Sequence, residues 1–190
     1  VLKQIKRTDF VDETLSGIAY ADTGLPIGYG QTMLPPILQG RMLQALDIQK
    51  HETALEVGTG SGYLTALLAI LAQQVTTVDI VPELSALAEQ NIQKYGFNNV
   101  VFCIGDASKG WPLSDRVDVI VLTAAFVTVP DDYLQSLTVG GRLLAVVGQG
   151  QNMSVQLIRR LAEREWHTDT VLETVIPAVI NAEPKPEFEF

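Results

Sequence analysis

The chain has 190 residues, of which 47% are hydrophobic and 18% are charged. This composition can fill one sizeable core and differs from that of disordered proteins, so we expect a single domain over residues 1–190. The 13 Lys and Arg residues against 22 Asp and Glu residues give a formal net charge of −9, which argues against a nucleic-acid substrate held by general electrostatics.

Cysteine content and hydropathy help to predict the cellular compartment of the protein. Cys103 is the single cysteine, so no intrachain disulfide can form, and the apolar runs are too short to span a membrane. We therefore expect a cytoplasmic protein with no membrane partner. No signal peptide is visible, and because the chain begins at Val1 rather than Met, we expect that an upstream segment is missing. His51 and His167 lie far apart without metal-ligand spacing, so no metal site is predicted.

Residues 1–52 are predicted to form short helices and a loop. An amphipathic start over 1–7 and a helix over 10–18 lead into a turn-rich stretch, 20–30, that contains three glycines and one proline. A second helix is expected over about 37–46, with Pro36 near its N-terminus as proline prefers. Because the loop at 20–36 directly precedes a ligand-binding pattern, we expect it to cover the ligand.

That pattern begins at residue 53, where a short apolar run enters a glycine-rich turn. Residues 53–57 predict a buried strand, and the leucines between 64 and 71 recur at the spacing of one helix face. Gly58, Gly60 and Gly62 allow a sharp turn and a close backbone approach to a ligand. The dinucleotide fingerprint has its third glycine three residues after the second, and Tyr63 at that position disfavours a nicotinamide dehydrogenase.

An acidic residue follows at the spacing that a nucleoside ligand requires. The strand predicted over 75–78 ends at Asp79, which lies 79 − 62 = 17 positions past Gly62, about where a carboxylate meets ribose hydroxyls. The alternative is a tight strand-to-helix turn without a ligand, with Asp79 as a solvated strand end.

The remaining chain is predicted to alternate between helices and strands, and then to end in two strands with no helix between them. We predict a helix from Pro82, strands over 100–104, 117–122 and 142–147, and a helix over 130–137, which together favour a parallel sheet covered on both faces. Asp106 again follows a strand end, where ligands bind in open parallel sheets. The alternative for Asp106, as for Asp79, is a solvated strand end without a ligand. Strands over 155–162 and 167–176 have only four residues between them, so they should pair as an antiparallel hairpin.

Several motifs resemble one enzyme family. The pattern Glu56-x-Gly58-x-Gly60-x-Gly62 resembles the first motif of S-adenosylmethionine-dependent methyltransferases. The stretch 25–32, Leu-Pro-Ile-Gly-Tyr-Gly-Gln-Thr, is typical of the protein-L-isoaspartate (D-aspartate) O-methyltransferases alone. It occurs with the motifs at 19–22, 105–107 and 140–143 in the order found in that family, and the resemblance covers about residues 9–177.

The resemblance implies a fold and an activity. The fold would be an α/β, Rossmann-like, doubly wound and mainly parallel sheet of about seven strands ending in an antiparallel hairpin. The core would occupy 53–180 and a tail would occupy 181–190. The activity would be methyl transfer from S-adenosylmethionine to the carboxylate of isoaspartyl residues in damaged proteins, without a metal. Isoaspartyl-containing peptides or proteins would be the substrate.

The resemblance also assigns roles to residues. Gln31 and Thr32 would lie beside the methyl donor, although Thr32 is also open to the simpler reading of a residue that shapes a turn. Asp79 would hold the ribose hydroxyls, and Asp106 would face the adenine amino group. The predicted cofactor-binding residues are Glu56, Gly58, Thr59, Gly60, Gly62, Asp79, Ile80, Gly105, Asp106 and Ala107.

Two positions differ from the family pattern. Leu34 stands where the family usually has serine, and Val175-Ile176-Pro177-Ala178 replaces Phe-Val-Pro-Leu. Two alternatives therefore stay open. One is a methyltransferase that uses a different acceptor, and the other is a catalytically weak relative that binds the cofactor.

Overall fold

The computed structural model describes residues 2–182. The N-terminal part contains two 3-10 helices, a two-stranded sheet and a helix, whose bounds are η1 (Arg7–Phe10), η2 (Glu13–Ile18), β1 (Leu25–Gly28), β2 (Gln31–Met33) and α1 (Pro36–Leu46). The remaining elements are β3 (Thr53–Val57), α2 (Tyr63–Leu71), β4 (Gln74–Asp79), α3 (Pro82–Gln93), β5 (Val100–Ile104), β6 (Val117–Phe126), α4 (Asp131–Gln135), β7 (Leu137–Gln149), β8 (Asn152–Ala162) and β9 (Glu165–Glu173). Most of the expected tail at 181–190 lies outside the described residues.

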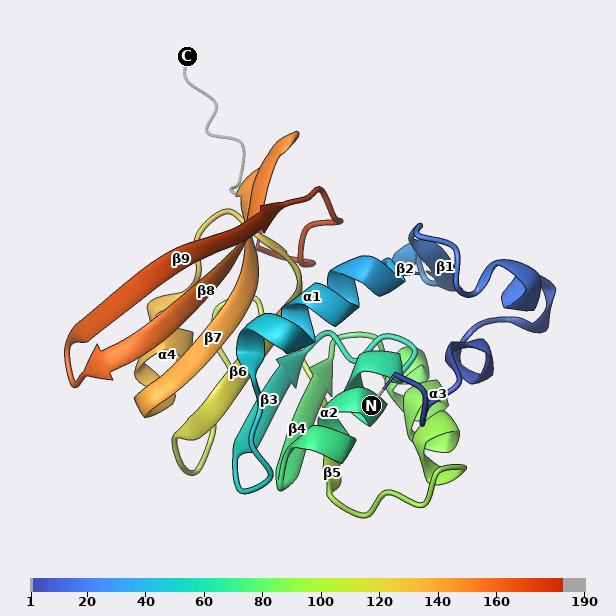
Figure 1. The fold of residues 1–190 in the computed structure, drawn as a ribbon, viewed down its shortest axis with the longest axis horizontal. Helices are drawn as coiled ribbons and strands as arrows, with labels where there is room; N and C mark the ends of the chain where they lie inside the picture. The colour runs from blue at the N-terminus through green and yellow to red at the C-terminus, as the bar shows by residue number, and fades with distance from the viewer. Residues whose placement is uncertain (1, 183–190) are drawn as a thin grey trace.

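A seven-stranded sheet in the order β5-β4-β3-β6-β7-β8-β9 forms the centre of the protein (Figure 1). The strands from β5 to β7 run parallel, and β8 and β9 each pair antiparallel with the strand before them. This architecture confirms the predicted Rossmann-like α/β fold and its terminal hairpin. Within this sheet, the chain forms the central strand β3 first and then adds β4 and β5 on one side of it. It then crosses to the other side of β3 to form β6. The strand order therefore switches between β3 and β6, where open parallel sheets bind ligands.

Both faces of the sheet are buried, but their cover is unequal. Val119 and Val121 belong to one hydrophobic cluster while Ile120 and Leu122 belong to the other, as expected when successive side chains of a strand point to opposite faces. Helices α1 and α2 lie on one face, and α4 lies on the opposite face (Figure 1). The segment 105–116, which has no helix, and the five-residue α4 cover this second face.

The N-terminal region differs in detail from the expectation. The predicted helix over 10–18 is wrong in type, because residues 7–10 and 13–18 form two 3-10 helices. The predicted loop over 20–36 contains the β1–β2 hairpin, in which Leu25 pairs with Met33 and Pro26 with Thr32. Tyr29 at its tip has φ 55° between two glycines that also have positive φ, so the tight turn depends on those glycines. Strands of four and three residues are too short for a hydrophobic period to reveal.

Aromatic contacts join the N-terminal segment to the Rossmann-like core. The ring of Phe10 lies 5.5 Å from that of Tyr63 on α2 and 5.8 Å from that of Tyr95 beyond α3. These contacts pack the N-terminal segment against α2 and the end of α3, and the expectation of one domain stays a prediction. Within residues 2–182, no helix combines the length and the apolar composition needed to cross a membrane.

Candidate active site

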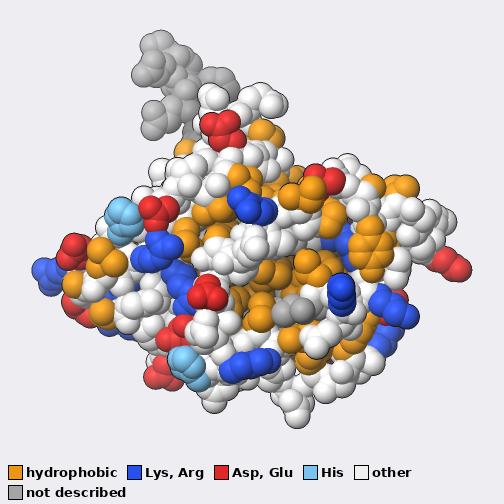
Figure 2. Space-filling model, viewed as in Figure 1, with side chains coloured by type: hydrophobic (Ala, Val, Ile, Leu, Met, Phe, Trp, Pro, Cys, Tyr) orange, Lys and Arg blue, Asp and Glu red, His pale blue; other side chains and the backbone are white. Residues whose placement is uncertain are grey.

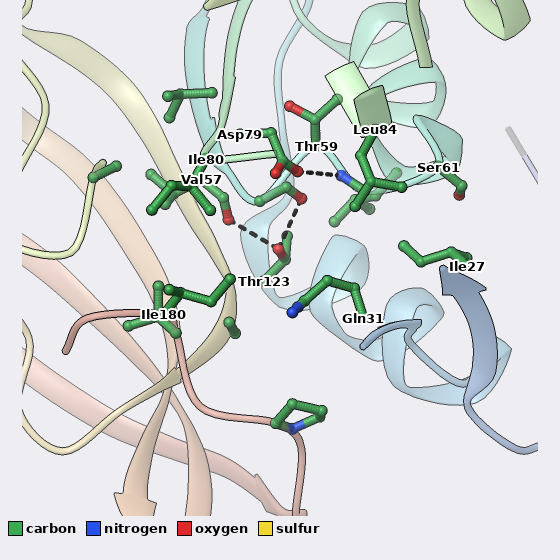
Figure 3. A pocket seen from close by; sticks show the side chains of 18 of the residues that line it. Ile27, Gln31, Val57, Thr59, Ser61, Asp79, Ile80, Leu84, Thr123 and Ile180 are labelled. Carbon is green, nitrogen blue, oxygen red and sulfur yellow. Dashed lines mark hydrogen bonds between the residues drawn. The ribbon is translucent and has the colours of Figure 1, made fainter. Parts of the chain in front are cut away.

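A cavity opens at the carboxyl ends of β3, β4 and β6, beside the point where the strand order switches (Figure 3). Its walls come from the β1–β2 hairpin, the glycine loop, the loops after β4 and β5, the end of β6 and the segment 177–180. Segments far apart in sequence therefore meet at one place, as a Rossmann-like ligand site requires. The predicted residues that line it are Gln31, Thr32, Gly58, Thr59, Gly60, Asp79, Ile80, Gly105, Asp106 and Ala107.

The two other predicted residues, Glu56 and Gly62, lie outside the cavity lining. Glu56 is fully buried on β3, and its Oε2 accepts hydrogen bonds from Thr65 Oγ1 at 2.5 Å and from Thr77 Oγ1 at 2.7 Å. Thr77 Oγ1 lies 2.7 Å from Thr59 Oγ1, so two hydroxyl groups link Glu56 to the cavity wall. The sequence pattern predicts Glu56 as a cofactor-binding residue, but the structure places it on β3 with its carboxyl group behind the loop rather than in the cavity lining.

The Glu56 carboxyl group is in an unusual electrostatic environment. Burial raises the pKa of Glu56 to about 8, because desolvation penalises the charged form more than hydrogen bonds from Thr65 and Thr77 favour it. Its Oε1 is buried and has no hydrogen-bond partner within the described part of the chain. The site therefore holds Glu56 mainly as a neutral acid at pH 7.

Gly58 and Gly62 are required in the glycine loop for different reasons. Gly58 has φ 94°, and a Cβ there would lie 2.2 Å from Thr123 Oγ1, so this glycine allows the end of β6 to approach the loop. Gly62 has φ 87°, and a Cβ there would lie 2.9 Å from the Cβ of Ala88 on α3. Gly62 therefore serves the packing of two helices, which explains its position outside the cavity.

Asp79 fixes the glycine loop from the end of β4. Its Oδ2 accepts a hydrogen bond from the backbone N–H of Gly60 at 2.8 Å, and its Oδ1 accepts one from Val81 at 2.9 Å. Figure 3 shows the Asp79 carboxylate beside this backbone nitrogen at the rim of the cavity. The carboxylate thus braces the loop while it remains part of the cavity lining.

Asp106 lies on the loop after β5, where it lines the cavity and is exposed. Its Oδ1 accepts a hydrogen bond from the backbone N–H of Ser108 at 2.9 Å, and its Oδ2 accepts one from Asn181 Nδ2 at 2.9 Å. These bonds, led by those from Ser108, lower the pKa of Asp106. Asp106 therefore stays ionised at neutral pH and can accept a further hydrogen bond from a ligand.

Sequence reasoning missed several residues of the cavity. Thr123, at the end of β6, lies 2.8 Å from the carbonyl oxygen of Val57 and 2.9 Å from that of Gly58, and its hydroxyl group donates to them. Thr123 directly follows the strand predicted over 117–122, so the strand-end rule that found Asp79 and Asp106 could also have found it, although β6 continues to Phe126. Pro177 belongs to the stretch 175–178 that the family pattern already singles out, whereas Val179 and Ile180 gave no signal, because their position depends on long-range contacts. The missed lining residues that matter most are Gln39, Ser61, Thr123, Val179 and Ile180.

Gln31 and Thr32 lie on β2, on the hairpin wall. Figure 3 shows the Gln31 amide pointing into the cavity, on the side opposite Asp79. Thr32 also packs inside the hairpin, since a Cβ at Gly24 would meet its Cγ2 at 2.6 Å. The structure thus places both predicted residues at the cavity and gives Thr32 a packing contact as well.

A Rossmann-like sheet with a glycine-rich loop after its first strand, and with carboxylates after the next two, defines a protein that binds a nucleoside-bearing cofactor. The model of the family Protein-L-isoaspartate(D-aspartate) O-methyltransferase (PCMT) matches residues 1–183. The chain belongs to this family, and it is therefore a methyltransferase.

Relatives support this membership over most of the chain. The chain is 39% identical over 171 residues to a protein-L-isoaspartate O-methyltransferase of Magnetococcus marinus, a match that covers 90% of this chain and 75% of the relative. It is 46% identical over 147 residues to the protein of that name from Myxococcus xanthus, which covers 77% of this chain and 69% of the relative. The sequence resemblance is thus confirmed at the level of the family.

Solved structures match the fold. A Plasmodium falciparum structure, described as a putative protein-L-isoaspartate O-methyltransferase in complex with S-adenosyl-L-homocysteine, is 20% identical with a TM-score of 0.82, and the match covers 94% of this chain and 87% of that one. A second structure, named protein-L-isoaspartate O-methyltransferase, is 23% identical with a TM-score of 0.81, covering 92% of this chain and 58% of that one. At these identities the likeness concerns the fold.

Proposed function

We propose that this protein transfers the methyl group of S-adenosylmethionine to the carboxylate of isoaspartyl residues in damaged proteins, as the first step of their repair. The observation that carries the proposal is the position of the hairpin stretch 25–32. This stretch resembles the isoaspartyl family specifically, and it faces the glycine loop across one cavity. The cofactor end and the acceptor end of the proposed reaction therefore share one space.

The residues present fit the proposed cofactor. At Gly58 the backbone approaches Thr123 so closely that any side chain would collide, so glycine is required at this position of the cavity lining. Asp79 offers a carboxylate for ribose hydroxyls, and Asp106 offers one for an amino group. Ile80 and Leu84 add apolar surface to the same cavity lining. When bound, the cofactor supplies a methyl group on a positively charged sulfur.

The protein's own contribution is positioning. A carboxylate acceptor is already ionised at pH 7, so no general base is needed for an in-line displacement. Alignment of two reactants in one cavity can lower the barrier by about 7–11 kcal/mol. We assign the alignment to Gln31 and Thr32, and we assign the exclusion of water to buried Met33 and Leu34 beside them.

The charge distribution supports a peptide rather than a nucleic acid as the acceptor-bearing molecule. The net charge is −9, and Figure 2 shows Lys and Arg side chains interspersed with Asp and Glu side chains over the face it presents. Nucleic-acid binding depends on clustered positive charge. The expectation of a cytoplasmic setting rests on the single free cysteine, Cys103, and stays a prediction.

The test is labelled-methyl transfer to an isoaspartyl peptide and to its aspartyl twin, after calorimetric titration with S-adenosylhomocysteine. Binding together with transfer to the isoaspartyl peptide alone is the expected result. An Asp79→Ala variant purified in parallel should lose the transfer, which excludes a contaminating methyltransferase. Binding without transfer to either peptide would contradict the isoaspartyl assignment and favour another acceptor.

A further inference from the structure

Arg7 carries a guanidinium group that is buried without a carboxylate partner. The residue is 0% exposed, and its Nε donates to the carbonyl oxygen of Ala19 at 2.6 Å while Nη2 donates to that of Leu34 at 2.6 Å. Its Nη1 donates to Gln39 Oε1, and its Cζ lies 5.1 Å from the centre of the Tyr63 ring. All the acceptors are neutral, and no ion pair joins Arg7 to any other residue within 2–182. A positive charge is therefore present in the interior without a negative one beside it.

The bond to Arg7 fixes the orientation of the Gln39 amide. A guanidinium group only donates hydrogen bonds, so the atom of Gln39 that faces it must be the carbonyl oxygen Oε1. Nε2 must then point away from Arg7. Gln39 is only 3% exposed and lines the cavity, and no acceptor for its Nε2 is found among the residues that the structure describes. Nε2 is not among the fully buried side-chain atoms without a partner in residues 2–182, so it keeps some accessible surface. Because Gln39 lines the cavity, this donor is open to a ligand there.

The free donor lies at the acceptor end of the cavity. Gln39 is in the first turn of α1, and Arg7 binds both its side chain and the backbone of Leu34, which directly follows β2. The side chain of Leu34 lines the same wall and offers no polar atom. Asp79 and the loop after β5 lie on other walls, where the nucleoside is expected.

We propose that the side-chain amide of Gln39 binds the acceptor carboxylate, with Nε2 donating to one of its oxygens, and that Arg7 holds this amide in place. This inference rests on the proposed function and adds to it a specific binding group. A hydrogen bond from Arg7 to Oε1 polarises the amide and makes Nε2 a stronger donor. The guanidinium charge, one amide group away, also offsets the burial of the incoming negative charge. Gln39 is a binding residue in this scheme, and Arg7 is a positioning residue.

The experiment compares Gln39→Leu and Gln39→Glu with Gln44→Leu, a matched control on the exposed side of the same helix. Steady-state methylation of an isoaspartyl peptide is measured together with calorimetric binding of S-adenosylhomocysteine. We expect both Gln39 variants to raise the KM for the peptide by about tenfold or more, as the loss of a hydrogen bond to a charged group implies. The Kd for S-adenosylhomocysteine and the Gln44→Leu kinetics should be unchanged. Gln39→Glu gives Arg7 a charged partner, so it should stay folded while it repels the acceptor.

A second measurement needs no substitution. In protein labelled with 15N at glutamine, the side-chain amide signal of Gln39 should shift when the isoaspartyl peptide is added in the presence of S-adenosylhomocysteine. The aspartyl twin should leave the signal in place. This readout follows the contact itself rather than the rate.

The possible failures are distinguishable. Kinetics of Gln39→Leu within twofold of the unchanged protein, or an amide signal that the peptide does not move, would overturn the inference while leaving the proposed function intact. A weaker Kd for S-adenosylhomocysteine with an unchanged peptide KM would overturn it too, because the amide would then serve the carboxylate of the cofactor. If the unchanged protein methylates no isoaspartyl peptide, the proposed function fails and the inference falls with it.

Discussion

Asn181 donates its side-chain amide to the Asp106 carboxylate at 2.9 Å, although 75 positions separate the two residues in sequence. Asn181 has φ 68°, a left-handed conformation that asparagine tolerates better than most residues. The segment before it is held to the end of β6, because Ala125 donates to the carbonyl oxygen of Pro177 and accepts from Val179, each at 2.9 Å. The bond from Asn181 to Asp106 therefore closes a short strap, residues 177–181, over one side of the cavity.

Loss of this bond should speed the release of S-adenosylhomocysteine. Asn181→Gly keeps the left-handed backbone and removes the donor, and a net loss of about 1 kcal/mol predicts a roughly fivefold faster dissociation. Asn181→Asp should have a larger effect, because it places a second carboxylate against Asp106. Stopped-flow measurements of S-adenosylhomocysteine release give the dissociation rates of both variants. Asn98→Asp, an exposed site with the same change of charge, should behave like the unchanged protein, and equal rates in all four proteins would show that the strap does not close the cavity.

Asp79 is expected to contribute to both ligand affinity and loop stability. Asp79→Asn leaves one acceptor oxygen where the structure uses two, at Gly60 and Val81, and it removes the negative charge offered to ribose hydroxyls. We expect the affinity for S-adenosylhomocysteine to fall by tenfold or more, since hydrogen bonds to charged groups contribute about 1.5–3 kcal/mol. Calorimetry measures the change. Glu83→Gln, in the exposed first turn of α3, is the matched control, and an unchanged affinity in Asp79→Asn would remove Asp79 from the site.

A comparison of alanine substitutions at Gly62 and Gly96 can separate the free-energy cost of backbone strain from that of disrupted packing. Both have positive φ, 87° and 72°, but a Cβ at Gly62 would lie 2.9 Å from Ala88 Cβ, whereas one at Gly96 would meet nothing within 4 Å. Gly96→Ala should therefore lower the free energy of unfolding by about 1 kcal/mol, the usual cost of a left-handed alanine. Gly62→Ala should lower it by a further 1–3 kcal/mol, because α2 and α3 must move apart. Urea denaturation measures the difference, and equal losses in the two variants would contradict the packing role.

The sequence predicts the central sheet well, because local signals dominate there. The apolar run before Gly58 and the carboxylates after two further strands locate β3, β4, β5 and the cavity they share. The terminal hairpin follows from the four residues between two strand-like runs. Chain order alone thus accounts for most of the cavity wall that carries the glycine loop, Asp79 and Asp106.

The remainder depends on contacts that no local pattern encodes. The direction in which Glu56 points follows from Thr65 and Thr77, which lie 9 and 21 positions away. The amide orientation of Gln39 follows from Arg7, 32 positions away. A buried arginine near the N-terminus looks like any charged residue in a sequence, so the acceptor side of the cavity needs three-dimensional information.

Glu56 should make the stability of the protein depend on pH in a characteristic direction. Burial raises the pKa of Glu56 to about 8 in the folded state, against an ordinary value of 4.5. Between these two values the folded protein holds a proton that the unfolded chain releases, so the contribution is fully present below about pH 4.5. It is lost as the pH rises through about 8. The free energy of unfolding should therefore decrease from pH 5.5 to pH 8 by an amount on the order of a few kcal/mol.

Glu56→Gln tests this dependence, because the amide resembles the neutral carboxylic acid and cannot ionise. The free energies of unfolding of the variant and the parent should be similar at pH 5.5, and the variant should be the more stable at pH 8. Other carboxylates titrate equally in both proteins, so the difference between the two proteins isolates Glu56. Urea denaturation at both pH values gives the measurement, with Glu89→Gln on the exposed side of α3 as the control. If the difference between parent and Glu56→Gln stays constant with pH, the carboxyl group is already charged in the folded protein over this pH range, and burial does not raise its pKa.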